Sequence, residues 1–142
     1  MAYTDLQSLT DRFGQQLLIQ LTDRADLATG TVDTTVVNAA IADTDALIDG
    51  YVSRRYALPM AEVPPLIASL ALDIAIYKLH VYTPSEKIGE DYKSAMRSLE
   101  AISNGSIRLP IDGVDATSSG SSGARVTDRD RPMTAQNLKG FI

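Results

Sequence analysis

The 142-residue sequence lacks several residue types on which common chemistries depend. It contains no cysteine, and this excludes a disulfide framework, thiolate zinc sites and cysteine nucleophiles. A single histidine, His80, is too few for a multi-histidine metal site and for most acid–base machinery. The glycine-rich phosphate-binding motifs and the Gly-x-Ser-x-Gly motif of serine hydrolases are also missing. We therefore expect a protein that is not an enzyme, with no catalytic residue, no metal site and no cofactor.

Basic side chains are in the minority: 13 Lys and Arg stand against 18 Asp and Glu, a formal net charge of −5. Nonspecific binding to nucleic acid requires positive charge, so this balance argues against it. Long uncharged runs are missing too. The most apolar stretch, residues 64–82, contains Asp73, Lys78 and His80, whereas a membrane span needs about 20 nearly uncharged residues. The first residues do not have the basic and apolar pattern of a signal peptide. We expect no membrane association.

What the sequence does contain is a helical spacing of apolar residues, which predicts an all-α bundle of about five helices. The predicted helices cover residues 4–13, 15–21, 34–56, 65–82 and 84–104. Two capping boxes, in which a Gln or Glu bonds back to the residue three positions earlier, assign the N-terminal caps of the first and fifth helices to Thr4 and Thr83. Asp33 or Thr34 caps the third helix, and Gly105 ends the fifth.

The fourth predicted helix is apolar nearly all round, which is typical of the most buried element of a bundle. We expect Leu70 and Ile74, at its centre, to lie in the core. Gly50 interrupts the third helix, where glycine costs about 1 kcal/mol relative to alanine, and its presence favours close packing against a neighbouring element. The predicted organisation is a helical domain, an extended segment with a Gly/Ser-rich spacer, and a C-terminal docking arm, at residues 1–105, 106–124 and 125–142.

The last residues of the chain carry apolar side chains that a solvated terminus does not need. Leu138, Phe141 and Ile142 follow the Gly/Ser-rich spacer, and the residues next to them predict no element that could bury these side chains. This pattern predicts a tethered peptide that docks on another surface. The alternative is an arm that folds back on its own domain.

Two groups of charged residues in the third helix invite a functional interpretation. Asp45 and Asp49 are four residues apart and share one face, which we interpret as a solvated acidic face because a metal site needs further ligands. Arg54 and Arg55 form the one basic doublet and are flanked by tyrosines. Both residue types are enriched at protein–protein interfaces, so this segment is a candidate for such a contact. A cation pair that opposes the helix dipole is the alternative explanation of the doublet.

Four stretches together are similar to a known family. They are residues 18–23 (LIQLTD), 45–59 (DALIDGYVSRRYALP), 92–99 (YKSAMRSL) and 137–141 (NLKGF), of which the second is the most specific. Through them the chain resembles the head–tail connector proteins of Mu-like phages and prophages. The resemblance runs essentially from end to end and is weakest in the Gly/Ser-rich spacer.

The resemblance implies an all-helical adaptor whose copies form a ring, with a dodecamer expected, under the portal protein. The ring would extend the DNA channel without binding DNA specifically and would dock the downstream neck or tail-terminator protein. The implied location is the neck of the virion, after assembly in the host cytoplasm. The implied portal contacts of the arm are Arg129, Arg131, Pro132, Met133, Leu138, Phe141 and Ile142. The implied contacts between copies, or within the core, are Tyr51, Arg54, Arg55 and Tyr56.

Other roles stay open at this stage. The chain could complete the neck or tail in another way, or stabilise the capsid. From a different class, it could be a small DNA-packaging or DNA-binding factor. The arm could also embrace a neighbouring copy instead of the portal.

Overall fold

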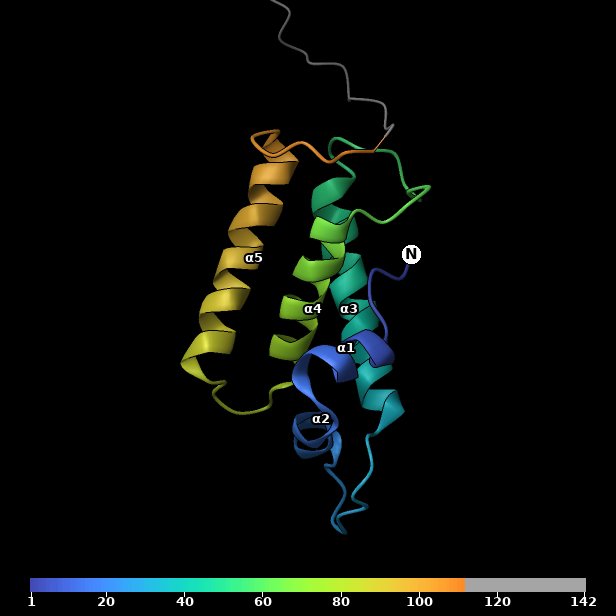
Figure 1. Cartoon of the computed structure of the whole chain (residues 1–142), viewed down its shortest axis with the longest axis vertical. Helices are drawn as coiled ribbons and strands as arrows, with labels where there is room; N and C mark the ends of the chain where they lie inside the picture. Colours follow the sequence, from blue (N-terminus) through green and yellow to red (C-terminus); the bar gives the residue numbers. More distant parts are fainter. Residues whose placement is uncertain (112–142) are drawn as a thin grey trace, which may run out of the picture.

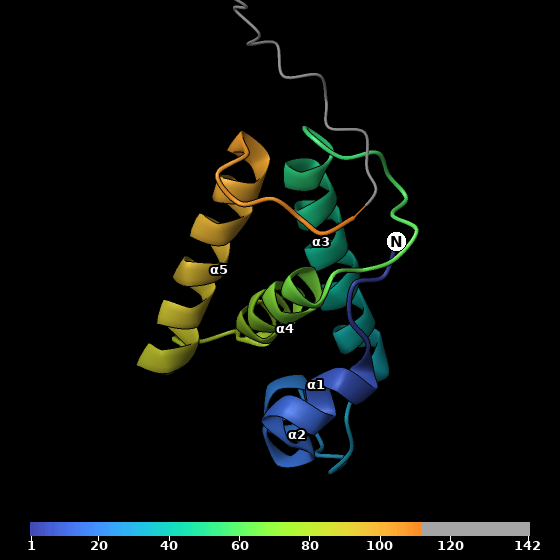
Figure 2. The ribbon, with the colours of Figure 1, turned by 45° about the horizontal axis from the view of Figure 1, so that its top comes forward.

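The computed structural model describes residues 1–111, and these form an all-α bundle of five helices, as the sequence predicts. The helices are α1 (Leu6–Phe13), α2 (Gln15–Thr22), α3 (Thr34–Val52), α4 (Pro65–Leu79) and α5 (Glu86–Asn104). The three long helices α3, α4 and α5 pack on one another, while the short helices α1 and α2 cover one end of this group (Figure 1). Seen from a second direction, α4 crosses between α3 and α5 (Figure 2).

The helices enclose two adjoining apolar clusters, and α4 contributes buried residues to both. One cluster joins the second half of α3 to α4 and α5, and it includes Leu70 and Ile74 at 6% and 0% exposure, which confirms their predicted place in the core. The other cluster lies under α1 and α2, with Leu9 and Leu18 fully buried against the first half of α3. The short helices therefore stay attached through their apolar sides.

The predicted helix caps are correct in two places and wrong in two. Asp33 caps α3 through its carboxylate, and Gly105 ends α5 with a left-handed φ of 87°. Gly14 has a positive φ of 88° between α1 and α2, a conformation that favours glycine. The cap of α1, however, is Asp5, whose carboxylate accepts the Ser8 N–H, and the cap of α5 is Ser85. Both helices thus begin after the threonines that the capping-box pattern selects.

Two predicted helices end earlier than their apolar pattern suggests. The third helix stops at Val52 instead of residue 56, because the N–H groups of Arg55 and Tyr56 both close on the Val52 carbonyl oxygen. The fourth stops at Leu79 instead of residue 82, because the chain is extended at His80. Two carbonyl oxygens of its last turn, those of Ile76 and Leu79, have partners outside the helix, the His80 ring and Arg24. Carbonyl groups at a helix end need such partners because no later turn supplies an N–H group.

The prediction for Gly50 is also wrong. A Cβ atom placed at this glycine meets no other atom within 4 Å, so no element packs closely there. After α5 the chain turns back over the core, and Leu109 is 6% exposed within the first cluster. The packed part of the chain therefore extends beyond α5. Among residues 1–111, no helix combines the length and the apolar character that a membrane span requires.

Candidate interaction surfaces

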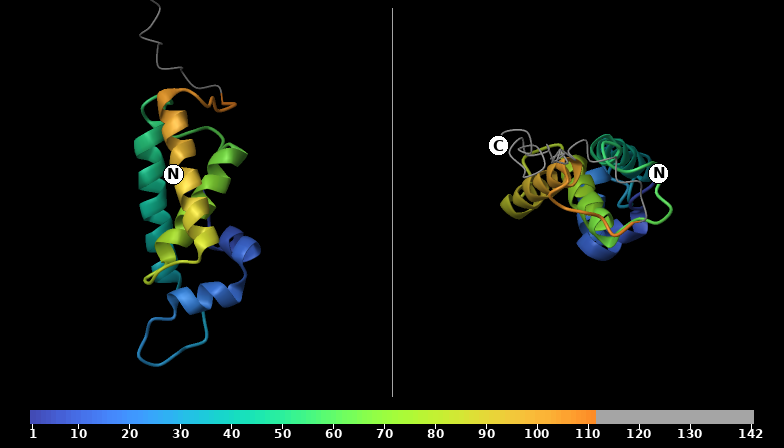
Figure 3. Two further views of the ribbon diagram at one scale, coloured as in Figure 1. Left: turned by 90° about the vertical axis from the view of Figure 1, so that its left-hand side faces the viewer. Right: turned by 90° about the horizontal axis from the view of Figure 1, so that it is seen from above.

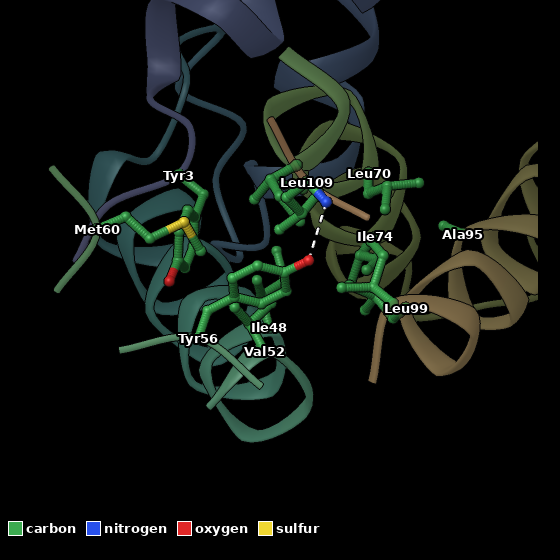
Figure 4. Close-up of a cluster of buried hydrophobic side chains, with 13 residues drawn as sticks. Tyr3, Ile48, Val52, Tyr56, Met60, Leu70, Ile74, Ala95, Leu99 and Leu109 are labelled. Carbon is green, nitrogen blue, oxygen red and sulfur yellow. Dashed lines mark hydrogen bonds between the residues drawn. The ribbon is translucent and has the colours of Figure 1, made fainter. Parts of the chain in front are cut away.

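The segment that follows α3, residues 51–56, mostly serves the bundle itself. Tyr56 is 6% exposed, and its hydroxyl oxygen accepts the backbone N–H of Leu109 at 2.9 Å (Figure 4). Tyr51 is half-buried against the same apolar cluster. Both tyrosines that the resemblance implies as contacts between copies, or within the core, are thus engaged within one copy.

Arg55 links the ends of α3 and α5. Its Nη1 donates to the carbonyl oxygen of Asn104 at 3.0 Å, the last residue of α5. The guanidinium lies over Gly105, where a Cβ atom would come within 2.0 Å of Nη1. A cation at a helix C-terminus is favourable because it opposes the negative end of the helix dipole. Arg54, in contrast, is exposed, so a contact with another copy stays a prediction for this residue.

Asp45 and Asp49 do not form the solvated face that the sequence predicts. Both are half-buried and hold the segment before α1 against α3. The Tyr3 N–H donates to Asp45 Oδ1 at 3.0 Å, and the Tyr3 hydroxyl donates to Asp49. Burial raises the pKa of Asp45 above its ordinary value, and burial together with Asp49 raises the pKa of Tyr3. Within the described part of the chain, no cluster of three metal-ligating side chains occurs.

His80 and Asp73 both lie within the predicted fourth helix, but in the fold they have separate partners. Asp73 pairs with Arg12 of α1 at 2.8 Å, and burial nevertheless raises the pKa of this carboxyl group. The Nδ1 atom of His80 lies 2.7 Å from the Ile76 carbonyl oxygen. Each side chain therefore joins or terminates helices, and the two do not form an acid–base pair.

The end of the bundle that holds α2 and the α4–α5 connection carries exposed apolar side chains that the sequence analysis missed. Tyr82, Leu27 and Val81 are 88%, 84% and 62% exposed. A groove of about 520 Å³ lies between the end of α2 and the α4–α5 connection, with Leu21, Val81 and Tyr82 in its lining. Val81 and Tyr82 looked buried in the sequence because the predicted fourth helix included them. The signal that could have found Leu27 is its isolated position in a polar loop.

The arm residues lie outside the described residues. They are Arg129, Arg131, Pro132, Met133, Leu138, Phe141 and Ile142. Their predicted contacts with the portal stay predictions.

The described residues form a small all-α bundle with exposed apolar side chains at one end. The chain belongs to a bacteriophage family, described as "Bacteriophage Mu, Gp36", whose sequence model matches residues 3–128. It is 31% identical over 142 residues to "Gene product J" of Escherichia phage Mu, with the whole of both chains covered. It is 28% identical over 140 residues to "Mu-like prophage FluMu protein gp36" of Haemophilus influenzae, covering 99% of this chain and 98% of that one. The expected kinship with Mu-like phages is confirmed.

Proposed function

We propose that this protein is a structural head–tail adaptor of a phage virion. In this proposal its copies form a ring under the portal protein, extend the DNA channel and dock the next neck or tail protein. The observation that carries the proposal is the match over the whole chain to a phage Mu protein of the same length. The protein performs no reaction in this role, and its function is to connect.

The charge of the bundle supports the role of a conduit. Residues 1–111 contain 14 Asp and Glu against 9 Lys and Arg, so their formal net charge is 9 − 14 = −5. Like charges repel, and a DNA duplex gains no counterion release on an acidic wall. DNA can therefore slide past such a surface without adhering to it.

The C-terminal segment supplies the proposed attachment to the portal. Residues 125–142 combine four basic side chains with two acidic ones, a net charge of 4 − 2 = +2, and they end in apolar anchors. Arg129 and Arg131 can pair with carboxylates, and Phe141 can fill an apolar pocket. A long tether also raises the effective concentration of such contacts in a ring, so that several weak attachments sum to a firm one.

Deletion of residues 125–142 tests this proposal. We expect the truncated protein to keep its helical circular dichroism and its melting temperature but to stop co-purifying with the portal protein. A milder variant, Phe141→Ala, should weaken the association and leave melting unchanged. Portal binding that survives the deletion at full strength would refute the attachment.

A DNA-binding role makes the opposite prediction. Such a role would rest on the exposed Arg54 and on the basic residues of the C-terminal segment, and its binding would weaken steeply with salt. In a mobility-shift titration of the full-length protein with duplex DNA we expect no shift. A salt-dependent shift at modest protein concentration would replace the adaptor proposal with this one.

A further inference from the structure

The two ends of the bundle differ in a way that gives the molecule a direction. At one end, which we call the exit end, lie the last turns of α3 and α5, and the described part of the chain ends there (Figure 1). At the other end lie α2, the loop of residues 23–33 and the α4–α5 connection (Figure 3). The apolar side chains Leu27, Val81 and Tyr82 are exposed at this second end, which we call the distal end.

The groove at the distal end is held in shape by Arg24. Its Nη2 donates to the Leu79 carbonyl oxygen at 2.8 Å, and its Nε donates to the Leu21 carbonyl oxygen at 3.1 Å. This guanidinium therefore joins the last turns of α2 and α4, from which the chain continues into the two segments that line the groove, residues 20–24 and 80–83. A preformed hollow with aliphatic and aromatic lining loses little ordering entropy when a partner enters it.

Two cationic side chains near the distal end already donate hydrogen bonds within the bundle. Arg24 satisfies helix carbonyls, and Lys78 donates to the Asp43 carbonyl oxygen at 3.1 Å. Two carboxylates of the distal end, Asp26 and Glu86, make no hydrogen bond or ion pair with another described residue. The distal end therefore carries exposed apolar side chains and, outside the lining of the groove, two carboxylates that have no partner among the described residues.

We propose that the distal end docks a segment of a different virion protein in which an aliphatic or aromatic side chain stands beside a lysine or arginine. This inference rests on the proposed function, in which the portal lies on the side where the described residues end and the distal end faces the tail. A symmetric contact between two distal ends is disfavoured, since it would bring the carboxylates of two copies together. The exposed Tyr82 is the central anchor, and Asp26 faces the partner's cation.

The experiment compares phage particles that contain variants of this protein. The double variant Val81→Ser, Tyr82→Ser removes the anchors, and both side chains are exposed, so the purified protein should melt like the wild type. Leu66→Ser is the matched control, because Leu66 is also an exposed apolar residue, at 38%, but lies at the opposite end of α4. We expect the double variant to remain on purified heads and to lower the number of tailed particles at least about tenfold, as loss of an aromatic interface anchor does to affinity. Asp26→Lys should also lower the number of tailed particles.

A photo-crosslinking residue at position 82 identifies the occupant directly. A cross-link in purified particles to a different virion protein, through a peptide with a basic residue beside an apolar one, supports the proposal. A cross-link to another copy of this chain, including its residues 125–142, overturns it, and so do normal tail numbers with the double variant. If instead the protein truncated after residue 124 stays on the heads, the proposed portal attachment fails, whatever happens at position 82.

Discussion

The hydrogen bond between Tyr56 and Leu109 gives the most direct test of how the chain after α5 is held. Tyr56→Phe removes only the hydroxyl oxygen, and the Leu109 N–H then has no acceptor in a buried position. An unsatisfied buried donor costs about 1–3 kcal/mol. At roughly 4 °C of melting temperature per kcal/mol for a domain of this size, the expected decrease is about 4–12 °C.

Tyr51→Phe provides the control, because Tyr51 touches the same apolar cluster but makes no hydrogen bond with another described residue through its hydroxyl group. Thermal denaturation followed by circular dichroism measures both variants. If Tyr56→Phe melts within about 1 °C of Tyr51→Phe, which is far less than an orphaned donor predicts, the segment after α5 is not fastened in the way described. Leu109→Ala should lower stability as well, and its effect should not add fully to that of Tyr56→Phe because the two residues share one contact.

The remaining predictions concern the core and the buried carboxylate. Ile74→Ala removes three carbon atoms from a fully buried position and should cost about 2–5 kcal/mol in urea denaturation, whereas Leu66→Ala, at 38% exposure, should cost under about 1 kcal/mol. Equal effects would contradict the central position of α4. Because folding raises the pKa of Asp45, the stability that this group contributes is full below its unfolded pKa and is lost as the pH rises through its folded pKa. Asp45→Asn should therefore melt above the wild type at pH 7 and lose this advantage near about pH 3. The exposed Asp43→Asn serves as the control, and an advantage that grows towards acid pH would refute the assignment.

Apolar periodicity predicted the existence and the order of all five helices, because burial of an apolar face is decided within each segment. The helix ends were less predictable. The fourth helix reads as apolar through residue 82, but its last turn is completed by Arg24 from the α2 end and by the His80 ring. The contact of Arg24 with Leu79 joins residues that are far apart in the sequence, and no local pattern contains it. The buried contacts of Tyr3 with α3 were invisible for the same reason.

The sequence does not show which charged side chains have hydrogen-bond partners within the fold and which are left for contact with another molecule. Read from the sequence, the cations Arg24, Arg55 and Lys78 partly offset the acidic residues around them. In the folded chain each of the three donates to a main-chain carbonyl oxygen, and two of these carbonyls, at Leu79 and Asn104, end a helix. Their N–H groups thus bond within the bundle, while the oxygens of two carboxylates at the distal end, Asp26 and Glu86, accept no hydrogen bond from another described residue. The direction of the molecule follows from this difference: a surface that offers apolar anchors and unpaired carboxylates selects a cationic partner, and the exit end, where Arg54 and Arg108 are exposed, does not offer that combination.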